Sequence, residues 1–212
     1  MAVKSKWIIN CFDISVAYLH SKLDEEIYVS APIEFRPEWT GKVTKLNKAM
    51  YGLKQEGQFW WLHFQSIMLK LNFIAEELDQ LIYCCTKGET IIYLWMNVDD
   101  GVIFSNDQEA VSKLRIQLTE DFKVKWEDKL TRIVEINFKQ EDNKLVLSQT
   151  DFARQIIQHF ERKSNSPLLQ TLSVLPETKL QTSQGIPIEQ KWYQSIIGSL
   201  YYLVLGTRAD LS

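Results

Sequence analysis

The stretch "YLWMNVDDGVIF" (residues 93–104) places two adjacent carboxylates, Asp99 and Asp100, inside an otherwise apolar segment. The β-branched and aromatic side chains on both sides predict two strands, so we expect the pair at or near the tip of a hairpin. A buried carboxylate without a partner is energetically costly. The pattern therefore predicts that a cation or a hydrogen-bond donor meets the two aspartates.

A metal ion is the cation that fits such a pair. Mg²⁺ prefers oxygen ligands and is often held by one or two carboxylates together with substrate phosphates. A third carboxylate at the end of a neighbouring strand would complete a two-metal site for phosphoryl transfer, and Asp13, at the end of "KWIINCFDI" (6–14), is the candidate. Adjacent aspartates also occur in turns and at helix N-termini, so the residues alone leave both interpretations open.

The composition is that of an ordinary globular protein. The 212 residues suffice for one domain with its own core, with or without a short appendage, and 45% are hydrophobic and 24% charged. A net charge of −3 creates no global basic field for nucleic acid. Residues 42–70 are rich in lysine and residues 76–109 in acids. This contrast fits either a phosphate track beside a cation site or two solvated faces of opposite sign.

The cysteines and the apolar segments indicate an intracellular protein. Cys11, Cys84 and Cys85 form no CxxC pair, which predicts neither a disulfide framework nor a zinc site and favours a reducing compartment. The first residues lack the apolar stretch of a signal peptide, and the most apolar run, 195–206, is too short to span a bilayer.

Hydrophobic periodicity predicts a mixture of strands and helices, and hence an α+β fold. Strands are expected at 6–14, 25–32 and 42–53, in a hairpin over 81–97 with a return strand at 102–105, and in a second hairpin over 132–148. Helices are expected at 58–73, at 108–122 with Asp107 as N-cap, at 149–160 and at 189–205. The apolar stripe expected on the first helix comprises Phe59, Leu62, Ser66, Leu69 and Phe73.

Five blocks of the chain resemble, in order, blocks of copia-type (Ty/copia) retrotransposon reverse transcriptases. They are "FDISVAYLHSKLDEEIYVSAP" (12–32), "KLNKAMYGLKQEGQFWW" (45–61), "NVDD" (97–100), "KLVLSQTDFARQII" (144–157) and "YQSIIGSLYYLVLGTRADLS" (193–212). The resemblance implies a polymerase palm-like antiparallel sheet with packed helices, truncated fingers and a partial thumb or connection. Residues 1–162 would form the palm-like domain with incomplete fingers, 163–188 a linker, and 189–212 the start of a connection region that precedes an absent ribonuclease H domain.

The same resemblance implies a catalytic centre. Asp13, Asp99 and Asp100 would be the catalytic carboxylates and would hold two Mg²⁺ ions. The implied substrates are an RNA or DNA template–primer and a deoxynucleoside triphosphate, with no membrane. A parent polyprotein or a partner chain would supply the missing fingers and ribonuclease H, and the implied location is intracellular and cytoplasmic, with a virus-like particle or the nucleus as alternatives.

Three further residues correspond to the family's nucleotide site. Tyr18 stands where an aromatic side chain selects deoxynucleotides, and Gln55 matches the glutamine that lines the nucleotide site. Lys54 beside it would approach the backbone of template or primer. Simple packing of Tyr18 and solvation of Lys54 remain alternatives, and Trp60 and Trp61 are expected to pack the helix rather than stack on bases.

The chain also departs from the family pattern. Asn97 replaces the aromatic residue before V-D-D, Glu56 brings a carboxylate to the expected substrate track, and Arg132–Ile133–Val134 lacks the family's glycine. Two hypotheses follow. The chain is an RNA-directed DNA polymerase that these changes impair, or it is a catalytically inactive transposon relic that acts as a nucleic-acid- or protein-binding fragment. The hydrophobic periodicity through residue 205 argues against a remnant that scarcely folds.

Overall fold

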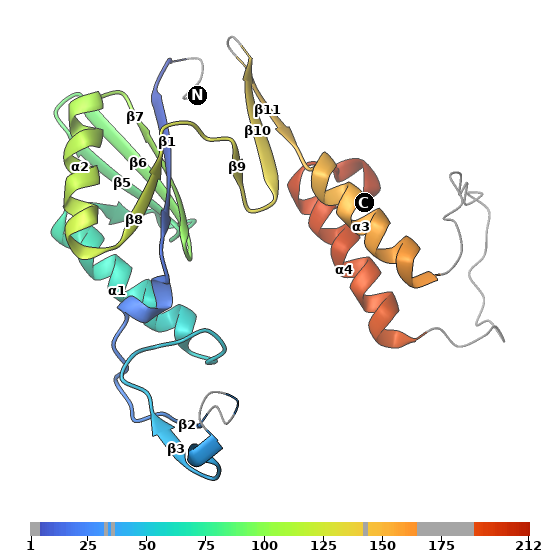
Figure 1. Cartoon of the computed structure of the whole chain (residues 1–212). Coiled ribbons are helices and arrows are strands. Elements are labelled where there is room, and N and C mark those ends of the chain that lie inside the picture. Colours follow the sequence, from blue (N-terminus) through green and yellow to red (C-terminus); the bar gives the residue numbers. More distant parts are fainter. Residues whose placement is uncertain (1–4, 32–33, 35–36, 142–143, 165–188) are drawn as a thin grey trace. The chain divides into compact units, whose positions relative to one another are not determined.

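The computed structural model describes residues 5–31, 34, 37–141, 144–164 and 189–212 (Figure 1). The chain forms two compact units, Met1–Leu130 and Thr131–Ser212. All three aspartates singled out by the sequence lie in the first unit, together with Tyr18, Lys54 and Gln55.

The first unit is built on a six-stranded sheet in the order β4-β5-β6-β7-β1-β8, in which every neighbouring pair is antiparallel. Its strands are β1 (Ile8–Ile14), β4 (Ile74–Ala75), β5 (Ile82–Lys87), β6 (Thr90–Asn97), β7 (Asp100–Ser105) and β8 (Val124–Glu127). Strands interspersed with helices confirm the predicted mixed α+β class.

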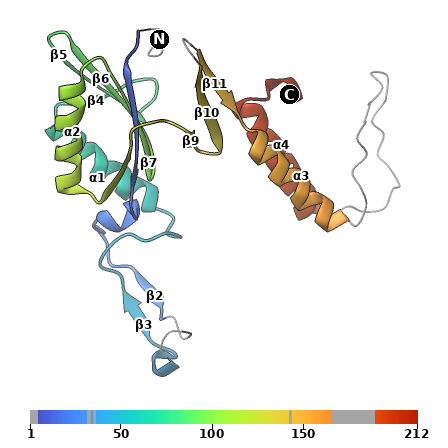
Figure 2. The ribbon, with the colours of Figure 1, turned by 45° about the horizontal axis from the view of Figure 1, so that its top comes forward.

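Two helices, α1 (Glu56–Lys70) and α2 (Gln108–Asp121), pack on one face of this sheet (Figures 1 and 2). The core joins strand residues such as Phe12, Ile14 and Leu94 with Trp60 of α1 and Leu118 of α2. Because successive side chains of a strand point to opposite faces, Asp13, between Phe12 and Ile14, lies on the face away from the helices.

The apolar stripe predicted for the first helix was wrong within the helix, although its last member, Phe73, is buried just beyond the end of α1. The buried residues of α1 are Trp60, Phe64, Ile67 and Met68. Leu62 and Leu69, which belong to the predicted stripe, are 46% and 58% exposed. Apolar side chains surround most of this helix, so its own periodicity does not decide which stripe meets the sheet.

The strands before α1 are shorter than predicted. β2 (Tyr28–Ser30) and β3 (Val43–Lys45) form a separate two-stranded sheet, and Pro32 lies outside the described residues. The strand predicted over 42–53 was wrong beyond Lys45, because the chain turns there toward α1. Gly52 takes a φ of 104° in this connection, a value that glycine tolerates and an extended strand excludes.

The N-cap predicted for α2 is confirmed. The Asp107 carboxylate accepts hydrogen bonds from the backbone N–H groups of Glu109 at 2.9 Å and Ala110 at 3.1 Å. The Thr90 hydroxyl donates to the same carboxylate at 2.8 Å, which ties the start of α2 to the start of β6. These bonds satisfy N–H groups that have no partner inside the helix.

The second unit consists of β9 (Arg132–Ile133), β10 (Ile136–Glu141), β11 (Lys144–Ser148), α3 (Thr150–Ser164) and α4 (Gln190–Gly206). The hairpin predicted over 132–148 is present, but its first strand is interrupted by a two-residue turn in which Val134 and Glu135 have φ values of 46° and 60°. The Tyr202 hydroxyl of α4 donates to the Val134 carbonyl at 2.7 Å. Figure 2 shows α3 and α4 side by side.

Residues 163 and 164, predicted as the start of a linker over 163–188, belong to α3, which continues to Ser164. Residues 165–188 lie outside the described residues.

A substitution at Gly101 tests the pairing of β1 with β7. Gly101 lies opposite Phe12, and a Cβ atom added to it would lie 2.1 Å from Phe12 Cζ. The Phe12 ring is 3% exposed and cannot move aside freely. We expect Gly101→Ala to lower the free energy of unfolding by about 1–3 kcal/mol, measured by urea denaturation.

Gly57→Ala is the matched control, because a Cβ atom at this position in α1 meets nothing within 4 Å. It should leave stability unchanged or raise it by up to about 1 kcal/mol. Equal stabilities of the two variants would contradict the close approach of Phe12 to Gly101.

Candidate active site at the β6–β7 turn

A two-residue turn, Val98–Asp99, joins β6 to β7. Asn97 and Asp100 face each other as the last strand pair before the turn. Val98 has a φ of 55°, in the left-handed region that a β-branched residue rarely adopts. Asp99 has no positive φ, and in a two-residue turn in which only the first residue does, that residue is usually glycine. The conformation of Val98 is therefore held by its surroundings.

Trp60 of α1 supplies part of that support. Its indole N–H donates to the Val98 carbonyl at 2.9 Å, and its side chain is 3% exposed among Phe64 and Phe122. The prediction that Trp60 packs the helix is confirmed. The same residue also fixes the main chain of the turn, a role that the sequence did not reveal.

Strand pairing brings the predicted aspartates to one end of the sheet. Asp13 of β1 is the cross-strand partner of Asp100 of β7. The Ile14 N–H donates to the Asp99 carbonyl at 2.7 Å, so the Asp13–Asp100 pair occupies the narrower, non-hydrogen-bonded position of the ladder, in which facing side chains are closest. Asp99 is the turn residue that precedes Asp100.

The electrostatics of this group are unfavourable. Burial raises the pKa of Asp100, and the charges of Asp13, Asp99 and Glu127 raise it further. Burial also raises the pKa of Asp99, as does the charge of Asp13, while a hydrogen bond from Tyr51 acts in the opposite direction. Among the described residues, the ion pairs include none that joins these aspartates to a lysine or arginine. Like charges that face each other across a ladder are destabilising.

The donor atoms suit a hard cation, although the carboxylates do not form a closed set. Carboxylate oxygens are the ligands that Mg²⁺ prefers, and a cation would relieve the repulsion between Asp13 and Asp100. Within the part of the chain that the structure describes, no group of three or more acidic, histidine or cysteine side chains is already arranged to hold a metal ion. The chemistry of the site therefore fits Mg²⁺, whereas a completed coordination shell is not present.

Tyr51 is the neighbour that sequence reasoning missed. Its hydroxyl lies 2.9 Å from both Oδ1 and Oδ2 of Asp99. Burial and this hydrogen bond raise the pKa of Tyr51 to about 12, so the hydroxyl remains a donor at neutral pH. Tyr51 belongs to the "YGLKQ" stretch, but spacing alone could not show that this tyrosine meets an aspartate far along the chain.

Tyr18 packs against Tyr51. The two rings meet edge to face with centroids 4.5 Å apart, and Tyr18 is 9% exposed in the short 3-10 helix Ala17–His20 that follows β1. Burial raises the pKa of Tyr18, and the charges of Glu56 and Asp99 add to the effect. The structure thus places Tyr18 close to Asp99.

Lys54 and Gln55 are less closely tied to the aspartates. Lys54 is exposed, and the described residues include no hydrogen bond or ion pair from its side chain. The Gln55 amide donates to the Glu25 carboxylate. Glu56, which brings a carboxylate to the expected substrate track, accepts a hydrogen bond from the Leu53 N–H at 2.9 Å and so caps the backbone before α1.

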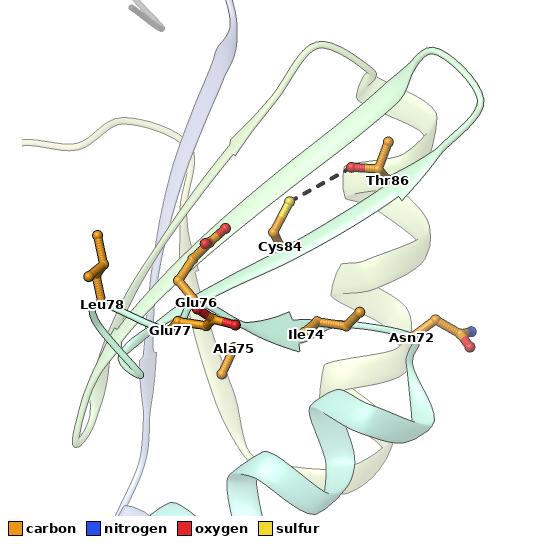
Figure 3. Close-up of a pocket in the computed structure, with 8 residues that line it drawn as sticks. All are labelled: Asn72, Ile74, Ala75, Glu76, Glu77, Leu78, Cys84 and Thr86. Carbon is orange, nitrogen blue, oxygen red and sulfur yellow. Dashed lines mark hydrogen bonds between the residues drawn. The ribbon is translucent and has the colours of Figure 1, made fainter.

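A surface pocket of about 610 Å³ lies elsewhere on the sheet, beside β4 and β5 (Figure 3). Figure 3 shows Cys84 and Thr86 on β5 and Ile74 on β4. The Cys84 sulfur lies 3.8 Å from the Thr86 hydroxyl. No predicted site residue lines this pocket, and β6 separates β5 from β7. The pocket therefore does not contain the aspartates.

Comparison with known proteins identifies the family to which the chain belongs. The sequence profile of the family described as reverse transcriptase (RNA-dependent DNA polymerase) matches residues 1–172. The chain belongs to this family. Its relatives narrow this family to the Ty1/copia-type retrotransposon reverse transcriptases, the family that the sequence blocks predicted.

Among these relatives is the retrovirus-related Pol polyprotein from transposon RE2 of Arabidopsis thaliana, 30% identical over 100% of this chain and 14% of its own length. The corresponding polyprotein from transposon TNT 1-94 of Nicotiana tabacum is 32% identical over 94% of this chain and 16% of its own length. A transposon Ty5-1 protein of Saccharomyces cerevisiae is 26% identical over 94% of this chain and 65% of its own length. The chain thus spans only a small part of the plant Pol polyproteins it matches.

None of the described helices combines the length and the apolar character that crossing a membrane requires.

Removal of one charge tests the electrostatics of the aspartates. The pKa of Asp100 is raised in the folded chain. At a pH above this raised pKa, the ionised Asp100 therefore lowers the free energy of unfolding. This loss of stability becomes smaller as the pH drops through the raised pKa, and it is absent below the ordinary pKa of aspartate. We expect Asp100→Asn to raise the free energy of unfolding by about 0.5 kcal/mol near pH 7.5, and by nothing near pH 3, in urea denaturation.

Asp24→Asn, which removes the same charge from an exposed position before β2, is the control and should change stability little at either pH. A loss of stability in Asp100→Asn near pH 7.5 would show that Asp100 is stabilised by a partner rather than repelled by its neighbours.

Proposed function

We propose that this chain carries the polymerase chemistry of a reverse transcriptase, the template-directed addition of deoxynucleotides to a primer. Membership of the reverse transcriptase family supports the reaction type. The observation that carries the proposal to particular residues is the pairing of Asp13 with Asp100 across β1 and β7, with Asp99 beside them in the turn. Three carboxylates at one end of an antiparallel sheet suit a two-metal site.

In this proposal Asp13, Asp99 and Asp100 hold two Mg²⁺ ions. When bound, the ions activate the primer 3′-hydroxyl and stabilise the leaving pyrophosphate. The protein's own contribution is positional. The β1–β7 ladder sets the separation of Asp13 and Asp100, and the hydrogen bond from Trp60 to Val98 holds the turn that carries Asp99.

The nucleotide would lie beside the aspartates. Tyr18 is proposed to select deoxynucleotides, which its position next to Tyr51 and Asp99 supports. Gln55 is proposed to contact the nucleotide. To do so, its amide must release the Glu25 carboxylate and bind the substrate instead. The exposed Lys54 is proposed to approach a backbone phosphate of template or primer.

The finer architecture belongs to the same proposal. The six-stranded sheet with α1 and α2 on one face is interpreted as a polymerase palm, within a palm-like region of residues 1–162. Residues 189–212, which include α4, are interpreted as the start of a connection region. The proposed partners are a template–primer and a deoxynucleoside triphosphate, and the proposed context is a Pol polyprotein like those of the plant relatives.

A second candidate is a nucleic-acid-binding relic without catalysis. The absence, among the described residues, of a ready three-ligand metal cluster favours this alternative. So does the engagement of Gln55 by Glu25. The two candidates differ in one observable property, which is whether a bound primer is extended.

Primer extension separates the two candidates. The chain is incubated with oligo(dT)–poly(rA), dTTP and Mg²⁺, and product length is followed on a denaturing gel. We expect extension by the wild-type chain and a loss of at least about 100-fold in the Asp99→Asn/Asp100→Asn double variant, because these carboxylates are proposed to hold the metal ions.

Asp24→Asn serves as the control and should extend the primer like the wild type. Retarded migration of the template–primer without extension, from a chain that circular dichroism shows to be folded, would favour the relic and contradict the polymerase.

A further inference from the structure

Tyr51 and Trp60 contact the two residues of the β6–β7 turn from outside the hairpin. Trp60 donates to the main chain of Val98, and Tyr51 donates to the side chain of Asp99. Both come from one continuous stretch, residues 51–61, which turns at Gly52 and then enters α1. This stretch therefore determines where the turn lies and also restrains the Asp99 side chain.

The geometry of the Tyr51 contact is suited to orienting a carboxylate without using all of its lone pairs. The hydroxyl oxygen is equidistant, at 2.9 Å, from Oδ1 and Oδ2 of Asp99. A hydroxyl has one proton and a carboxylate has about four acceptor positions, so most of the lone pairs of Asp99 stay available. One oxygen can accept from Tyr51 while the other binds a cation.

Tyr51 is itself held in place. Its ring packs edge to face on Tyr18, which is 9% exposed and follows the strand of Asp13 directly. Tyr51 is 48% exposed, so its replacement by phenylalanine removes a hydroxyl without opening a cavity in the core. A backbone hydrogen bond from Ala17 also acts on the Asp99 carboxylate. Without the Tyr51 hydroxyl, Asp99 would lose one of these two restraints, and a cation would have to order the side chain further on binding.

We propose that Tyr51 is a positioning residue that orients the Asp99 carboxylate for a divalent cation. The proposal rests on the function proposed above, because it takes Asp99 as a ligand for the catalytic metal ions. Hydrogen-bond partners of metal ligands fix the orientation of those ligands, and their loss typically weakens metal binding by about 10–100-fold. Tyr51 has this relationship to Asp99.

Mn²⁺ binding to the free protein tests the proposal without any need for catalysis. The probe is Mn²⁺ itself, whose unbound fraction is read from its room-temperature electron paramagnetic resonance signal during a titration. We expect Tyr51→Phe to weaken Mn²⁺ binding by about 10-fold and Asp99→Asn to weaken it at least as much. Adding Tyr51→Phe to Asp99→Asn should cause no further loss, since Tyr51 acts through Asp99.

Tyr28→Phe is the matched control. Tyr28 also donates to a carboxylate at 2.9 Å, that of Glu26, and is similarly exposed at 54%, but it lies in β2. This variant should bind Mn²⁺ like the wild type. Thermal denaturation followed by circular dichroism compares the folding of all the variants.

Three results would overturn the proposal. The first is an unchanged Mn²⁺ affinity in Tyr51→Phe. The second is that Tyr51→Phe weakens Mn²⁺ binding as much in the Asp99→Asn background as in the wild type. The third is that the wild-type chain shows no saturable Mn²⁺ binding. If the wild-type chain extends a primer and Tyr51→Phe binds Mn²⁺ like the wild type, the proposed role of Tyr51 is refuted and the polymerase function is not. The expected Mn²⁺ pattern without primer extension would refute the polymerase function and leave Tyr51 as the residue that orients Asp99.

Discussion

The antiparallel pairing of β1 with β7 is the constraint on which the candidate site depends. One register places Asp13 opposite Asp100 on the face away from the helices, and Phe12 over Gly101 on the face that the helices cover. A shift of one residue would exchange the two faces, so that the aspartates would meet the helices and the Phe12 ring would meet solvent. The burial of Phe12 and Ile14 therefore specifies the position of the carboxylates, although these core residues lie on the other side of the sheet.

The turn between β6 and β7 concentrates several unfavourable features. Val98 adopts a φ of 55°, and the ionised forms of Asp99 and Asp100 are disfavoured by burial and by neighbouring charge. Local propensity alone would not maintain this arrangement. It persists because Trp60 holds the Val98 carbonyl, Tyr51 holds the Asp99 carboxylate and Ile14 holds the Asp99 carbonyl. Strain and like charge that the surrounding structure supports are typical of a functional site.

The start of α1 and the residues just before it affect the candidate site because their side chains contact the β6–β7 turn and Tyr18. Trp60 belongs to the core and to the turn at once, since its indole ring packs on Phe64 while its N–H reaches Val98. Glu56 caps the backbone before α1 and also lies close enough to Tyr18 to raise the pKa of that residue. A change at Glu56 would therefore act on the helix start and on the surroundings of Tyr18 together.

Local sequence patterns determined much of this protein. The hairpin that carries Asp99 and Asp100, the Asp107 N-cap and the positions of the four α-helices in the described residues follow from periodicity and capping, because those signals act between residues close in the chain. The family also followed from the sequence, because its blocks are recognisable one after another. Tertiary structure decided the rest. The buried stripe of α1, the end of β3 at Lys45 and the contacts of Tyr51 and Trp60 with the turn depend on which elements pack together. Asp13 was named as a partner of Asp99 and Asp100, but only the β1–β7 ladder determines that it faces Asp100, because strand register is set by burial across the whole sheet.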